Sequence, residues 1–121
     1  MTNTILTVDD SRTMRDMLKM TLLDAGFRVT QAEDGVHGLE VLRQEMPRVI
    51  VTDINMPRLD GFGFIEAVRK EEKYRSIPIL VLTTESDDAK KMRARVAGAT
   101  GWIIKPFDPR KLIAAIRRVA A

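Results

Sequence analysis

The stretch RVIVTDINMP, residues 48–57, decides how the chain is organised. Its β-branched run VIV, residues 49–51, is typical of a strand that is buried on both faces of a sheet. The run stops at Asp53, and a loop pattern follows that ends with Asp60-Gly61. Ligands bind outside the carboxyl ends of strands in an open parallel sheet. We therefore expect the strand to present the Asp53 carboxylate at a functional edge, although Asp53 could also simply cap the next turn.

The composition indicates an ordinary globular domain. The 121 residues suit a single domain, and the hydrophobic content of 45% suits a packed core rather than disorder. There is no cysteine, which excludes disulfides, thiolate metal sites and cysteine nucleophiles. We recognise no signal peptide or membrane span, and we expect a soluble, cytoplasmic protein with no membrane partner. The net charge of +3 is small beside 20 basic and 17 acidic residues, and favours nucleic-acid binding only weakly.

Short apolar runs alternate five times with segments whose apolar residues recur at helical spacing. The predicted strands span residues 5–8, 28–32, 49–51, 79–82 and 101–104. The predicted helices run from Ser11 to Gly26, around residues 36–42, from 61 to about 72, from about 87 to 97, and onward from 109. This alternation predicts one α/β domain over residues 1–121, with a parallel sheet covered by five helices on its two faces.

Residue types that begin and end helices frame these segments. The predicted caps are Ser11, Ser86 or Asp87, and Asp108 before Pro109; the predicted terminating glycines are Gly26 and Gly98. The side chains expected to face the core are Met14, Met17, Leu18, Thr21, Leu22 and Ala25 in the first helix, Val36, Leu39 and Leu42 in the second, Phe64, Ile65 and Val68 in the third, and Leu112, Ile113 and Ile116 in the last.

Polar side chains follow four of the predicted strands. They are Asp9 and Asp10, Asp53 and Asn55, Thr83 and Thr84, and Lys105. In a parallel sheet these groups lie at one edge, where three carboxylates would repel one another unless a cation intervened. Mg²⁺ suits such oxygen ligands, and a lysine and a hydroxyl beside it would complete a cradle for a phosphoryl group accepted by an aspartate. Each residue alone also has a plainer interpretation, as a helix cap, a turn residue or a solvated lysine.

Together these residues resemble the response-regulator receiver family, in particular stand-alone receivers of the chemotaxis CheY type. The resemblance covers all 121 residues and rests on four motifs. They are Asp9-Asp10, DINMP at 53–57 with Asp60-Gly61, Thr83, and Lys105-Pro106-Phe107. It implies a doubly wound, flavodoxin-like sheet of order 2-1-3-4-5. It also implies a two-component phosphoprotein that acts as a switch in signal transduction and is not an enzyme for a separate substrate.

The resemblance implies that Asp53 accepts a phosphoryl group from a phosphohistidine on a sensor histidine kinase or its phosphotransfer domain, such as a CheA-like kinase. Asp10, Asp53 and the Asn55 backbone carbonyl would bind Mg²⁺ directly. Asp9 would act on the metal mainly through water.

The resemblance also assigns roles to residues around the acids. Lys105 would pair with Asp53 and then with the phosphoryl oxygens, and Thr83 would move to hydrogen-bond the phosphoryl group. The Lys105-Pro106 bond would be cis. Asn55 and Glu85 match positions that tune hydrolysis of the acyl phosphate, and a phosphatase is a further expected partner.

Trp102 departs from the family pattern, because receivers usually carry Tyr, Phe or His at this position. That aromatic normally turns inward when the threonine moves. Tryptophan is larger, and its indole N–H needs a partner when it is buried. Trp102 could therefore follow the inward movement or stay fixed as an anchor on the surface.

Eight basic residues mark the last two predicted helices. They are Lys90, Lys91, Arg93, Arg95, Arg110, Lys111, Arg117 and Arg118. They could simply be solvated helix faces. The family's output surface is formed by these helices and the fifth strand, so an acidic partner with Trp102 as an apolar anchor is the second interpretation. Nucleic-acid binding is a third, weaker alternative.

Three functions are considered for this sequence. The first is a chemotaxis regulator whose phosphorylated form binds a flagellar motor switch protein of the FliM type. The second is a phosphate sink or phosphorelay intermediate that binds no motor. The third is an aspartyl phosphatase of the haloacid-dehalogenase type, which the sequence disfavours because Asn55 stands where that class carries a general acid.

Overall fold

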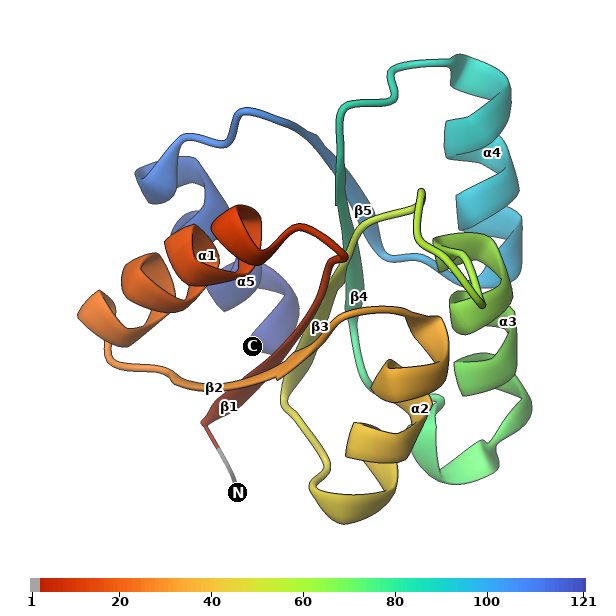
Figure 1. Ribbon diagram of the computed structural model, residues 1–121, viewed down its shortest axis with the longest axis horizontal. Helices are drawn as coiled ribbons and strands as arrows, with labels where there is room; N and C mark the ends of the chain where they lie inside the picture. The colour runs from red at the N-terminus through yellow and green to blue at the C-terminus, as the bar shows by residue number, and fades with distance from the viewer. Residues whose placement is uncertain (1–2) are drawn as a thin grey trace.

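The computed structural model describes residues 3–121 as a five-stranded sheet between two layers of helices (Figure 1). In chain order the elements are β1 (Thr4–Val8), α1 (Arg12–Asp24), β2 (Arg28–Ala32), α2 (Gly35–Gln44), β3 (Val49–Thr52), α3 (Gly61–Lys70), the short 3₁₀ helix η1 (Glu72–Tyr74), β4 (Ile79–Thr83), α4 (Asp88–Ala97), β5 (Gly101–Ile104) and α5 (Pro109–Ala120). The strands pair in parallel in the order β2-β1-β3-β4-β5. The predicted fold class and strand order are thereby confirmed.

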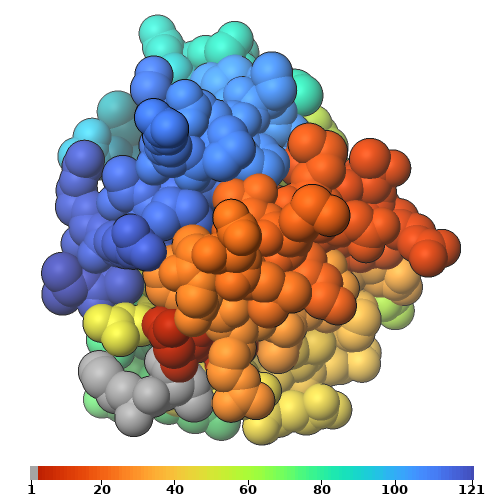
Figure 2. Space-filling view, turned by 90° about the vertical axis from the view of Figure 1, so that its left-hand side faces the viewer, coloured from red at the N-terminus to blue at the C-terminus, as the bar shows by residue number. Residues whose placement is uncertain are grey.

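Alternate residues of the central strands supply the two halves of the core. Ile50 of β3 packs on the side covered by α2, α3 and α4, whereas its neighbours Val49 and Val51 pack on the side covered by α1 and α5. Figure 2 shows that second side from outside, with the orange α1 beside the blue α5. Because both faces are covered, the β-branched run of β3 is buried throughout, as predicted.

Side-chain caps set where the helices begin. The backbone N–H groups of Met14, His37, Gly63, Ala89 and Arg110 donate to the caps Ser11, Asp34, Asp60, Asp87 and Asp108, respectively. Of the two caps predicted for α4, Asp87 is the one the structure uses. Gly26 and Gly98 have φ values of 92° and 120°, the left-handed conformation that ends a helix at glycine.

Two local expectations were wrong. Met17 is 49% exposed, because a residue adjacent to Leu18 lies about 100° away around the helix axis, outside the buried stripe. The helix α3 ends at Lys70 rather than near residue 72. The chain then turns through η1, which buries Tyr74 and lets its hydroxyl donate to the Leu42 carbonyl of α2 at 3.3 Å.

Candidate functional site

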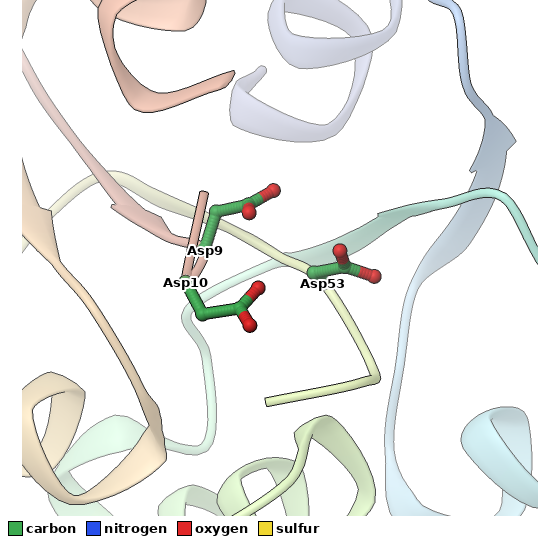
Figure 3. A group of neighbouring side chains, drawn as sticks. All are labelled: Asp9, Asp10 and Asp53. Atoms are coloured by element: carbon green, nitrogen blue, oxygen red, sulfur yellow. The ribbon is translucent and has the colours of Figure 1, made fainter. Parts of the chain in front are cut away.

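Three carboxylates gather at the carboxyl ends of β1 and β3 (Figure 3). Asp9, Asp10 and Asp53 each place one carboxylate oxygen within 4.8 Å of the others. The parallel register that pairs Val8 with Thr52 brings the residues after the two strands side by side. Asp9 and Asp53 are buried, whereas Asp10 is exposed. The cluster is therefore fixed in the wall of the sheet and open to water on one side.

Lys105 joins this cluster from the end of β5. Its Nζ lies 2.7 Å from Asp53 Oδ2 and 2.9 Å from Asp9 Oδ2. Burial raises the pKa of Asp9, and the hydrogen bond from Lys105 only partly offsets that rise. Burial alone would lower the pKa of Lys105, but its hydrogen bonds to Asp53 and Asp9 outweigh this and raise the pKa.

The pairing of Lys105 with Asp53 was expected, and the structure adds a contact with Asp9 that was not. Asp9 is also a direct partner of the ammonium group, because a buried carboxylate needs a hydrogen-bonding or charged neighbour. Its other oxygen accepts from the Ser11 backbone N–H at 2.9 Å. The Lys105-Pro106 peptide bond is cis, as expected.

The backbone after β3 orients Asp53 closely. The Ile54 N–H donates to Asp53 Oδ1 at 2.6 Å, and the Gly61 N–H donates to the Ile54 carbonyl at 2.8 Å. A Cβ on Gly61 would collide with the Asp53 carbonyl and would approach Ile54 Cα to 2.7 Å. Glycine is required at position 61 because the start of α3 packs directly onto the backbone that carries Asp53.

Thr83 lies at the end of β4 and is completely buried. Its Oγ1 accepts a hydrogen bond from the Glu85 N–H at 3.3 Å. Within residues 3–121, the Thr83 hydroxyl forms no hydrogen bond with Asp53 or Lys105, although the Lys105 backbone N–H donates to the Thr83 carbonyl at 2.8 Å. The threonine is thus at the predicted edge but is held by the β4–α4 loop rather than by the acids.

Glu85 connects the two loops at this edge. Asn55 Nδ2 donates to Glu85 Oε1 at 3.1 Å, and Lys90 Nζ lies 3.1 Å from Glu85 Oε2. These two contacts, that of Asn55 first, lower the pKa of Glu85. The Trp102 indole N–H donates to the Glu85 carbonyl at 3.0 Å, while the half-buried ring packs against the core beside α4. The indole therefore has the partner that a tryptophan at this position requires.

A second ion pair, which we did not predict from the sequence, ties the β3–α3 loop to α2. Arg58 donates to the buried Asp34 from Nε at 2.7 Å and from Nη2 at 3.1 Å. The Arg58 hydrogen bond lowers the pKa of Asp34. An aspartate followed by glycine at 34–35, directly before α2, is the sequence signal from which a capping role for Asp34 could have been found. The contact with Arg58 depends on a φ of 66° at Arg58, which no residue pattern indicates.

The acidic cluster fits a hard divalent cation. Three carboxylates supply the oxygen ligands that Mg²⁺ prefers, and the exposed side at Asp10 leaves room for the waters that Mg²⁺ retains. Lys105 supplies only one positive charge against the three acids. The remaining negative charge favours a further cation at this edge.

The comparison with family models decides the classification. The response regulator receiver domain matches residues 5–117. The chain belongs to this family. The chemotaxis protein CheY homolog of Campylobacter jejuni is 42% identical over 110 residues, which cover 89% of the chain and 85% of that protein. The probable transcriptional regulator ycf27 of Guillardia theta is 39% identical over 115 residues, or 95% of the chain, but the match spans only 44% of that protein.

Solved structures agree with this classification. The chemotaxis protein CheY4 of Vibrio cholerae superposes with a TM-score of 0.93 at 43% identity, covering 98% of the chain and 99% of CheY4. The receiver domain of the sensor histidine kinase PA1611 of Pseudomonas aeruginosa, solved with a magnesium ion in its active site cleft, gives a TM-score of 0.91 at 26% identity over 99% of the chain and 98% of that domain. The resemblance to CheY-type receivers is thereby confirmed. No helix within residues 3–121 has the length and apolar character needed to cross a membrane.

Proposed function

We propose that Asp53 is the phosphoacceptor of a switch driven by a histidine kinase. An Asp53 carboxylate oxygen would form the new bond to phosphorus while the bond from phosphorus to the donor histidine nitrogen breaks, leaving the electron pair on the imidazole. The observation that carries the proposal is the 2.7 Å contact between Lys105 Nζ and Asp53 Oδ2 inside a cluster with surplus negative charge. From this position the lysine would hold an oxygen of the transferred group.

Asp10, Asp53 and the Asn55 backbone carbonyl would hold Mg²⁺, with Asp9 bound through water. Bound Mg²⁺ would neutralise charge on the phosphoryl oxygens. Asp9 keeps its direct contact with Lys105 in this arrangement and so holds the ammonium group beside Asp53. Asn55 and Glu85, which are hydrogen-bonded to each other, would tune the hydrolysis of the acyl phosphate by controlling the access of water to it.

Two hydrogen bonds connect the acceptor edge with the proposed output face, which is formed by α4, β5 and α5. Thr83 Oγ1 accepts from the Glu85 N–H, and the Glu85 carbonyl accepts from the Trp102 indole. A movement of Thr83 toward a phosphoryl group would break the first bond and release the loop that holds the second. We expect the Trp102 fluorescence to change when Mg²⁺ and beryllofluoride, a phosphoryl mimic, are added, and we expect Thr83→Ala to suppress that change.

The target would be an acidic peptide with an apolar anchor. A hollow between α4 and β5 is lined by Trp102 and by the basic residues Lys91 and Arg95. The similarity to chemotaxis proteins favours a flagellar motor switch protein of the FliM type as the target and a CheA-like kinase as the donor. A motor-switch peptide should bind more tightly when the phosphoryl mimic is present. Equal binding with and without the mimic would contradict the proposed switch.

A phosphorelay role is the second candidate. Two of the similar solved structures are receiver domains of histidine kinases, with TM-scores of 0.90 and 0.91. In that role Asp53 would still accept phosphoryl groups from a kinase, but the chain would bind no motor protein. Rapid phosphoryl transfer from a phosphohistidine donor, combined with no binding of the motor peptide, would favour this alternative.

A further inference from the structure

The helix α4 is flanked by two hollows on opposite sides. The hollow toward β5 contains Trp102 and belongs to the proposed output face. The other lies between α4 and α3, which are neighbours on the right-hand side of Figure 1. Lys91 and Arg95 line the first hollow, whereas Met92 and Val96 line the second. The α3–α4 groove is therefore a separate surface.

An apolar ridge runs along the α4 wall of this groove. Met92 is 58% exposed and Val96 is 80% exposed, and the two side chains are four residues apart on one helix face. Ala89 continues the ridge toward the start of α4 and is also exposed. Large apolar side chains aligned in this way lose contact with water when a partner covers them.

The groove is also strongly basic. Four of its lining side chains carry positive charge, and the only acidic residue is Glu66. Arg93 stacks on the Phe62 ring at 4.0 Å, and Arg69 donates to the Gly98 carbonyl at 2.9 and 3.0 Å, so both charges are held in place. Lys70 and Arg75 are exposed at the α3 side. The apolar ridge thus lies among positive charges.

We propose that the α3–α4 groove is a second docking surface, which binds an acidic amphipathic helix. A groove between two helices accepts a third helix, whose apolar residues one turn apart would seat on Met92 and Val96. Acidic residues beside them would face Lys70 and Arg75. None of the lining residues belongs to the acidic cluster, so the partner would bind while Asp53 remains accessible to a kinase.

The test uses a synthetic helix-forming peptide of about 18 residues with two leucines four positions apart and glutamates on either side. A second peptide of the same composition places the leucines on opposite faces. Titration of the full ¹⁵N-labelled chain should shift the amide signals of residues 66–70 and 89–97 with the first peptide and should shift them more weakly with the second. Shifts confined to β5 and α5, or equal affinity for both peptides, would overturn the proposal.

Matched variants separate the groove from general attraction to a basic protein. Met92→Glu with Val96→Glu should lower the affinity at least about tenfold, because it adds acids where the partner's apolar side chains would sit. Met20→Glu with Leu23→Glu makes the same charge change on α1, where those residues are 75% and 50% exposed, and should leave the affinity nearly unchanged. Equal losses in both double variants would overturn the proposal.

A gentler variant keeps the test valid if the glutamates disturb α4. Lys70→Ala with Arg75→Ala retains the ridge and should weaken binding severalfold at low salt and much less at high salt. An unchanged affinity at low salt would contradict the charge argument. Anionic lipid vesicles form a separate arm of the experiment. If they bind the chain through the groove and the peptide does not, a membrane surface replaces the acidic helix and the proposal fails.

Discussion

Two aspartates, Asp53 after β3 and Asp34 before α2, are buried against cationic side chains. The Asp34 carboxylate is fully compensated, because it accepts two hydrogen bonds from Arg58 and one from the His37 N–H. Asp53 shares the single ammonium of Lys105 with Asp9, and Asp10 adds a third carboxylate. Both carboxylates are buried, so burial does not distinguish them.

The difference between the two sites lies in the charge balance. The Asp34 site needs nothing further, and we interpret it as structural. The Asp53 site has more negative charge than its lysine can neutralise, which is the condition under which a metal ion or a phosphoryl group gains from binding. Surplus charge at a rigid edge is therefore a better guide to function than an ion pair as such.

The largest expected effect is on phosphorylation, which should require Asp53 and not Asp34. Asp53→Asn should abolish the incorporation of a phosphoryl group from acetyl phosphate with Mg²⁺, because the amide cannot act as the nucleophile. Asp34→Asn should leave labelling substantially intact. Intact-protein mass spectrometry measures both variants. If Asp53→Asn is still labelled, another residue is the acceptor and Asp53 is not distinguished from Asp34 by function.

The removal of one carboxylate from the Asp53 site should weaken metal binding but stabilise the fold. Asp10→Ala should weaken Mg²⁺ binding at least about tenfold, because it removes one of the proposed direct ligands. Without Mg²⁺ the same substitution should raise the free energy of unfolding by about 1 kcal/mol, because it removes one of three carboxylates that repel one another. Calorimetric Mg²⁺ titration and urea unfolding measure the two effects. A loss of stability without metal would contradict the surplus-charge interpretation.

Replacement of the aspartate by alanine at the Asp34 site, where Arg58 balances the charge, should destabilise the fold. Asp34→Ala removes both the cap of α2 and the partner of Arg58, and should lower the free energy of unfolding by about 1–2 kcal/mol. Asp34→Asn keeps a capping oxygen and should cost less. Urea unfolding with Asp10→Ala in parallel compares the two sites directly. Equal effects of Asp34→Ala and Asp10→Ala would remove the distinction between them.

The smallest expected effect is a pH dependence of the Asp34–Arg58 pair. The folded-state pKa of Asp34 is lowered from 3.8, so its contribution to stability is present above that value and is lost as the pH falls through the folded-state pKa. The difference in unfolding free energy between the natural chain and Arg58→Ala should therefore be constant near neutral pH and shrink in acid. Urea unfolding from neutral pH to below pH 4 measures it, and a difference that grows in acid would contradict the sign.

Much of the site could be predicted from the sequence, because the strands that carry its charged residues are short apolar runs, each followed by a polar residue. Asp9, Asp10, Asp53 and Lys105 follow three such runs, and the parallel sheet brings them to one edge. The roles of these residues in phosphoryl transfer remain predictions. The direct contact between Asp9 and Lys105 was not predicted, because it depends on how deeply Asp9 is buried between neighbouring strands.

Local chemistry along the chain was enough to determine the α/β alternation, the caps Ser11 and Asp108 and the polar residues that follow the strands, since periodicity and capping act over a few residues. Only the tertiary structure decided that Arg58 reaches Asp34, that Trp102 binds the Glu85 carbonyl, and that Met92 and Val96 lie in a basic groove. These contacts join segments from different elements. They depend on the packing of helices and loops on the finished sheet, and no pattern within a single segment records that packing.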